Sequence, residues 1–158
     1  MSERIQKIKQ RLMDSRTRLN QVLDQVGDRW ETQVYAEGAA WTVRQLAVHL
    51  MITDKGQTNT IQGIAKGEEV VPADFDLERY NRRSVEKRAD MSVQDIRDNL
   101  AANAAERYIW LDTVDDSTLD KKGRHGSLAI LSIEEILGVI ANHERDHAND
   151  IAKALNIA

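Results

Sequence analysis

The pentapeptide HERDH places His143 and His147 four residues apart, with Glu144 directly after the first histidine. In a helix, this spacing puts both imidazoles on one face, one turn apart. Neutral imidazole is the commonest metal ligand in proteins, and the pattern H-E-x-x-H is typical of zinc metalloproteases. The segment therefore predicts a divalent-metal site. The alternative is a pair of core histidines whose ring nitrogens bond to backbone or carboxylate groups.

Two well-known metal sites that use this pattern do not fit the rest of the chain. A zinc metalloprotease takes its third ligand downstream of the motif, but only eleven residues follow His147, and none is Glu or His. Asp150 is the only acidic residue among them, and it shares the predicted helix. A di-iron bundle needs a second Glu-x-x-His pair, and no other histidine follows a glutamate at that spacing. We therefore exclude both classes.

A third ligand must then come from upstream, where His49 and His125 are the candidates. His49 lies in WTVRQLAVHLMITD, beside the apolar stripe of a predicted helix. His125 lies in the glycine-flanked loop KGRHGS. We expect it to be a solvent-exposed side chain, because polar residues in loops usually lie at the surface without a specific role. The residues thus favour His49 as the partner of His143 and His147.

Four long amphipathic helices are predicted to carry these side chains. Apolar residues recur at spacings of three and four over residues 3–26, 42–66, 92–114 and 132–155. Each of the last three segments has the pattern of a capping box with a hydrophobic staple. The cap pairs are Thr42 with Gln45, Ser92 with Asp95, and Ser132 with Glu135. Four such helices in one small chain predict an all-α fold, a four-helix bundle.

The connections between these helices are long, especially residues 67–91, so the bundle need not be a simple up-and-down meander. Within this connection, residues 77–88 place Leu77, Tyr80 and Ser84 on one side and predict a short extra helix. Its basic residues are interleaved with acids, and such charge runs usually form a solvated face. We expect no sheet. The length of 158 residues suits one domain over residues 1–158.

The composition excludes several partners and compartments. The formal net charge is −4, so no basic surface for nucleic acid or an anionic membrane is indicated. No apolar run approaches membrane-spanning length, and the first residues lack the apolar stretch of a signal peptide. The chain has no cysteine, which excludes disulfides and a cysteine nucleophile. We expect a cytoplasmic protein that binds neither nucleic acid nor membrane.

Four segments resemble those of the DinB/YfiT-like superfamily. WTVRQLAVHLMITD, with Trp41 ahead of the helix and His49 eight residues later, resembles the first family motif, and HERDHANDI resembles the closing one. DFDLERYNRRSVEKRADMS and GSLAILSIEEIL are similar to family segments as well. The resemblance implies a four-helix bundle, often a homodimer, with a divalent metal held by His49, His143 and His147. Known members include thiol S-transferases that use bacillithiol, mycothiol-dependent isomerases and many proteins of unknown activity.

A metal held by three neutral imidazoles keeps its full charge and an open position for water or substrate. It lowers the pKa of a bound water or thiol. Glu144 could act there as a general base, or it could turn toward a helix interface, since it is rotated by about 100° from His143. Asp150, one turn after His147, is predicted to accept a hydrogen bond from the ring nitrogen that does not bind the metal, and so to fix the tautomer of that imidazole. Asp146 is expected to be a surface acid.

Two classes of function remain. The first is a divalent-metal-dependent enzyme with Zn, Ni, Fe or Mn, which transfers a low-molecular-weight thiol to an electrophile or hydrolyses a small-molecule substrate. The second is a non-catalytic dimeric stress protein that binds a metal or a small ligand. An acidic residue over the metal and a pocket with a basic rim would favour the enzyme, and a closed, packed site would favour the second class.

Overall fold

Each of the four long helices begins after a Ser or Thr whose side chain accepts a hydrogen bond from the backbone N–H three residues later. The predicted capping boxes of Thr42 with Gln45 and of Ser132 with Glu135 are complete, with both side chains bonded to the backbone. At Ser92 only the serine bond forms. The aspartate at the third position is one methylene shorter than the Glu or Gln of a full capping box.

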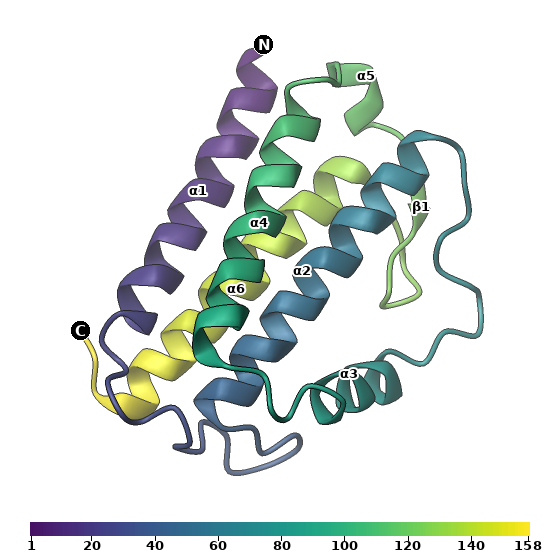
Figure 1. Ribbon diagram of the computed structural model, residues 1–158. Coiled ribbons are helices and arrows are strands. Elements are labelled where there is room, and N and C mark those ends of the chain that lie inside the picture. The colour runs from purple at the N-terminus through teal and green to yellow at the C-terminus, as the bar shows by residue number, and fades with distance from the viewer.

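The computed structural model describes residues 1–158 (Figure 1). The long helices are α1 (Glu3–Leu23), α2 (Val43–Ala65), α4 (Val93–Leu111) and α6 (Ile133–Leu155). The short elements are α3 (Leu77–Glu86), α5 (Asp116–Leu119), β1 (Lys122–Arg124) and β2 (Ile130–Ser132). The predicted four-helix bundle and its extra helix near residues 77–88 are confirmed. No helix is both long and apolar enough to cross a bilayer.

The helices are not arranged as an up-and-down meander. α1 packs mainly along α6, and α2 packs against both α4 and α6. α2 and α4 run in the same direction, because the connection between them, which includes α3, carries the chain back to the end where α2 begins (Figure 1). α2 and α6, which carry the predicted ligands, are therefore direct neighbours.

A layer of buried charged side chains lies between the two halves of the apolar core. One apolar cluster includes Leu46 and Ile151, and the other includes Ile61 and Ile136. We call the charged side chains between them the ionic layer, and each is at most 7 % exposed: Arg16, Asp54, Arg107 and Glu144.

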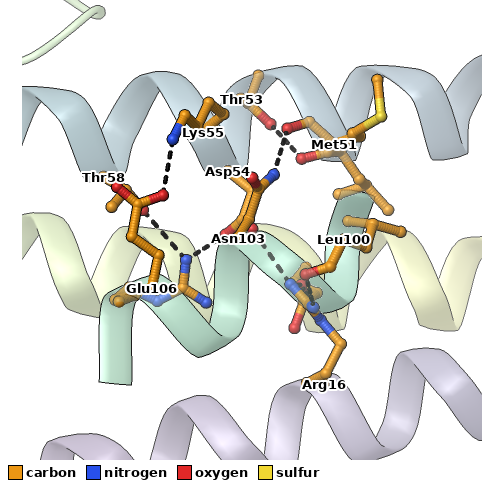
Figure 2. Close-up of polar contacts among 12 residues, drawn as sticks. Arg16, Met51, Thr53, Asp54, Lys55, Thr58, Leu100, Asn103 and Glu106 are labelled. Carbon is orange, nitrogen blue, oxygen red and sulfur yellow. Dashed lines mark hydrogen bonds and ion pairs between the residues drawn. The ribbon is translucent and has the colours of Figure 1, made fainter. Parts of the chain in front are cut away.

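The ionic layer ties all four long helices together. Arg16 on α1 lies 2.8 Å from Glu144 on α6. It also lies 3.3 Å from Asp54 on α2 (Figure 2). The other oxygen of Asp54 accepts a hydrogen bond from Arg107 on α4. Buried charges of this kind are tolerated only when they are paired, so the layer fixes how the helices align along the bundle.

The prediction of no sheet is wrong for one segment. β1 and β2 pair as a short antiparallel hairpin just before α6. Strands of three residues are too short to show the alternation that identifies a strand in a sequence. Two further differences are α5, which the sequence analysis does not predict, and the end of α1, which falls at Leu23 rather than near residue 26.

Candidate metal centre

Three imidazoles from two neighbouring helices converge on one point. His49 lies on the second turn of α2, and His143 and His147 lie one turn apart on α6. The Nε2 atom of His143 is 3.1 Å from Nε2 of His49 and 3.0 Å from Nε2 of His147. The structure thus brings together the three histidines that the sequence analysis selects as ligands.

This donor set fits a divalent metal ion. Zinc–nitrogen bonds are about 2.0–2.1 Å long, so two nitrogens on one ion are at most about 4.2 Å apart. The two measured Nε2–Nε2 separations lie well inside that limit. Within the protein these three nitrogens form hydrogen-bond contacts only with one another. Imidazole nitrogens that meet without a carboxylate or carbonyl between them are well suited to a shared cation.

The three imidazoles are neutral at ordinary pH. Burial and the neighbouring imidazoles lower the pKa of His49 to about 3. Burial, together with His147 and His125, lowers the pKa of His143 to about 4. Burial also lowers the pKa of His147, although Asp150 and Asp146 oppose this shift. Metal ligands must be deprotonated, so the site keeps its binding form below the ordinary imidazole pKa of about 6.5.

Apart from the contact of its Nε2 atom with His143, the His49 ring is held by packing rather than by hydrogen bonds. The Trp41 ring lies against it, with 4.7 Å between ring centroids and a tilt of 36°. The Nδ1 atom of His49 is buried and has no hydrogen-bond partner. A buried polar atom without a partner costs free energy. Such an atom requires an explanation, and a functional role of the ring is one.

Tyr35 orients His147 from the connection between α1 and α2. Its hydroxyl lies 2.6 Å from Nδ1 of His147 and 2.5 Å from Oδ2 of Asp150. A carboxylate only accepts, so the hydroxyl donates to Asp150 and accepts from the Nδ1–H of His147. This leaves a bare lone pair on the Nε2 atom that faces the other imidazoles. Asp150 itself is 3.9 Å from Nδ1, so its hydrogen-bond link to His147 runs through Tyr35.

We expect Tyr35→Phe to weaken the binding of a divalent metal by about 10–100-fold, the usual effect of removing a group that orients a ligand. Asp150→Asn should weaken it in the same direction, and combining the two changes should add little, because both break one chain of hydrogen bonds. The control is Tyr108→Phe. It removes a hydroxyl from a residue of α4 that packs against the apolar cluster of Ile61 and Ile136. Competition with a chelating indicator at neutral pH measures the affinity. Equal affinities in Tyr35→Phe and Tyr108→Phe would contradict this role.

The structure does not bring Glu144 to the three imidazoles. Its side chain is 4 % exposed and accepts a hydrogen bond of 2.9 Å from Nε of Arg16. Burial raises the pKa of its carboxyl, and Arg16 opposes that shift. Of the two orientations considered for Glu144, the helix interface is the one observed. A role as general base therefore finds no support in this geometry.

The expectation that His125 is solvent-exposed is wrong. It is only 9 % exposed, because the β1–β2 hairpin folds back toward α2. Its Nδ1 atom contacts Ser127, and its Nε2 atom lies 2.7 Å from the side-chain oxygen of Gln57 on α2. His125 does not join the three-histidine group, as expected. Asp146 is exposed, which also agrees with the sequence analysis.

A cleft of about 340 Å³ opens beside the three imidazoles. His49 and His143 line one part of it, and the remaining walls come from α2, Val139 of α6, the segment that precedes α3, α3 itself and the hairpin. This volume is in the range of small-molecule sites. The site is therefore open rather than closed and packed, but its lining contains no Lys or Arg, so the basic rim that would favour an enzyme is not found in that lining.

Comparison with known proteins identifies a family and a solved structure with a similar fold. The model of the DinB superfamily matches residues 11–151. A solved structure of YfiT from Bacillus subtilis superposes with a TM-score of 0.71 at 18 % identity, covering 100 % of this chain and 91 % of that one. YfiT is described as a probable metal-dependent hydrolase with an unusual four-helix bundle topology. No curated protein matches the chain. Because the family model spans most of its length, this chain belongs to the DinB superfamily.

Proposed function

We propose that this protein is a divalent-metal-dependent enzyme that hydrolyses a small molecule bound in the cleft. The observation that carries the proposal is the convergence of the Nε2 atoms of His49, His143 and His147 at the edge of an open cleft. Three protein ligands leave a position for substrate or water, which is the arrangement of catalytic rather than structural metal sites. The description of YfiT as a probable metal-dependent hydrolase supports the same reaction class.

In this proposal the ion, when bound, supplies a Lewis acid that polarises a carbonyl and lowers the pKa of water or thiol. The protein does the rest by positioning. Burial keeps the imidazoles neutral and ready to bind, and Tyr35 directs the lone pair of His147 toward the ion. The walls of the cleft hold the substrate beside the two ligands that they share, His49 and His143.

Transfer of a low-molecular-weight thiol is the second candidate. One observation favours it: neither carboxylate of the ionic layer is free to act as a base, because Glu144 and Asp54 are both paired with arginines. A thiol, with a pKa of about 8.5, needs less help to ionise than water, with a pKa of about 15.7. The chain has no cysteine, so the thiol would be a second substrate.

The test starts with protein purified without chelator or nickel affinity resin, in which bound metal is measured by mass spectrometry. We expect close to one Zn, Ni, Fe or Mn ion per chain. The same protein is then assayed with ester and amide substrates, and with electrophiles plus small thiols, before and after removal of the metal. Metal-dependent hydrolysis supports the first candidate, and turnover only with added thiol supports the second. Stoichiometric metal without turnover in either assay would instead indicate a non-catalytic binding protein.

A further inference from the structure

The walls of the cleft beyond the imidazoles carry no formal charge. No Asp, Glu, Lys or Arg lines it, and its apolar surface comes from side chains that include Ile52, Val71, Phe75 and Val139. A carboxylate or ammonium group buried against such a wall would lose its hydration without gaining an opposite charge, which is costly. The wall therefore accepts uncharged groups and rejects charged ones.

One polar side chain of this wall is held in a fixed orientation. The backbone N–H of Ser127 donates to Nδ1 of His125 at 3.1 Å. The proton of the neutral ring must then lie on Nε2, which donates to Oε1 of Gln57 at 2.7 Å. The oxygen of the Gln57 amide is thus occupied, and its orientation is set by the hairpin.

The other end of the Gln57 amide remains available. Its NH₂ group forms no hydrogen bond within the protein, and it is not among the buried atoms that lack a partner. Gln57 lines the cleft two turns after His49 on α2, about 12 Å further along the helix axis. The cleft thus presents a fixed hydrogen-bond donor in an otherwise uncharged wall, at a distance from the candidate metal centre.

We propose that the cleft binds small, uncharged acyl compounds, such as aliphatic amides and esters that carry a second carbonyl, and that the Gln57 amide donates to the carbonyl oxygen that lies away from the candidate metal centre. His125 is the positioning residue that holds Gln57 in the donating orientation. The assignment rests on the proposed function, since it names the substrate class of the same site. It also favours hydrolysis of neutral substrates over transfer of thiols that carry carboxylates.

The test compares hexanamide with hexanoate, two probes of equal chain length that differ in charge. Binding to the full chain is followed by NMR at neutral pH after chelation, so that no metal contributes. We expect hexanamide to bind at least about 10-fold more tightly, because the charge of the carboxylate would be desolvated without a cation to compensate it. This readout needs neither metal nor turnover, so its outcome is independent of whether the chain hydrolyses anything.

Two Gln57 variants test the donor. Gln57→Met should weaken hexanamide binding by about 5–10-fold, the effect of one lost hydrogen bond. Gln57→Glu keeps the acceptor for His125 but replaces the donor by a charge, and should acquire affinity for hexylammonium that the parent lacks. Gln62→Met, the same change on α2 outside the cleft lining, should bind hexanamide as the parent does.

Three outcomes would overturn the proposal. The first is equal affinity of the parent for hexanamide and hexanoate. The second is unchanged hexanamide affinity in both Gln57 variants. The third is a loss in Gln62→Met as large as that in Gln57→Met. The backbone amide signals in the NMR spectrum of each variant report whether it folds. The two Gln57 variants change the wall in different ways, so if one fails to fold, the other still tests the proposal.

Discussion

Alanine at any one of His49, His143 or His147 is expected to abolish most of the thermal stabilisation that a divalent ion gives to the parent protein. An ion that binds only the folded state at 100 times its Kd stabilises it by about 2.7 kcal/mol. For a chain of this size, that corresponds to a rise in Tm on the order of 5–10 °C. Two remaining imidazoles hold an ion far more weakly, so the rise should nearly vanish. Differential scanning fluorimetry over a series of metal concentrations measures it.

The control is His125→Ala, which removes a buried imidazole outside the three-histidine group. It should lower the Tm without metal but leave the metal-dependent rise intact. In the parent that rise should persist below pH 6.5. Protons compete for His49 and His143 only as the pH approaches their lowered pKa values, about 3 and about 4, and burial lowers the pKa of His147 as well. A loss of the rise in His125→Ala equal to that in the other variants would refute the assigned ligand set.

Asp54→Asn should cost the fold about 3–5 kcal/mol, because it leaves two buried arginines without the carboxylate they share. Asp54 accepts from Arg107 and pairs with Arg16 at 3.3 Å, and its side chain is 4 % exposed. The amide keeps the volume of the carboxylate, so the loss reports charge rather than packing. Urea unfolding of metal-free protein at neutral pH gives the change in the free energy of unfolding.

The matched control for this prediction is Glu106→Gln, the corresponding change from a carboxylate to an amide. Glu106 pairs with Lys55 at 2.6 Å, next to Asp54 on α2, but both side chains are more than 40 % exposed (Figure 2). Exposed pairs contribute only about 0–1 kcal/mol, so this variant should unfold almost like the parent. If the two variants lose similar amounts of stability, the ionic layer does not stabilise the bundle in the way described.

Much of the fold could be predicted because its signals are local. Caps such as Thr42 and Ser132 are read from residues three positions apart, and the apolar periodicity repeats over five or more turns in each long helix. The strands β1 and β2 are three residues long and α5 is four residues long, so no periodicity can accumulate in them. The parallel course of α2 and α4 depends on which faces bury each other over long sequence separations, and no local pattern encodes that.

The ligands could also be predicted, but the residues around them could not. His143 and His147 are linked by helical spacing, and His49 follows from the count of remaining histidines and from the family motif. Tyr35 and Gln57 are single polar residues in segments without a motif, and their roles depend on contacts with residues far along the chain. Glu144 has the spacing of a catalytic glutamate, yet Arg16, 128 residues earlier, pairs with it.

The packing of α1 against α6 also determines when the protein can fold during synthesis. α1 ends at residue 23 and its main partner begins at residue 133. At about 5–20 residues per second, the ribosome makes that partner roughly 5–20 s later. Until then the apolar stripe of α1 has no α6 to cover it and remains open to chaperones and to other nascent chains. The bundle is therefore expected to close only after α6 leaves the ribosomal tunnel, so ribosome-bound chains that lack α6 should be protease-sensitive.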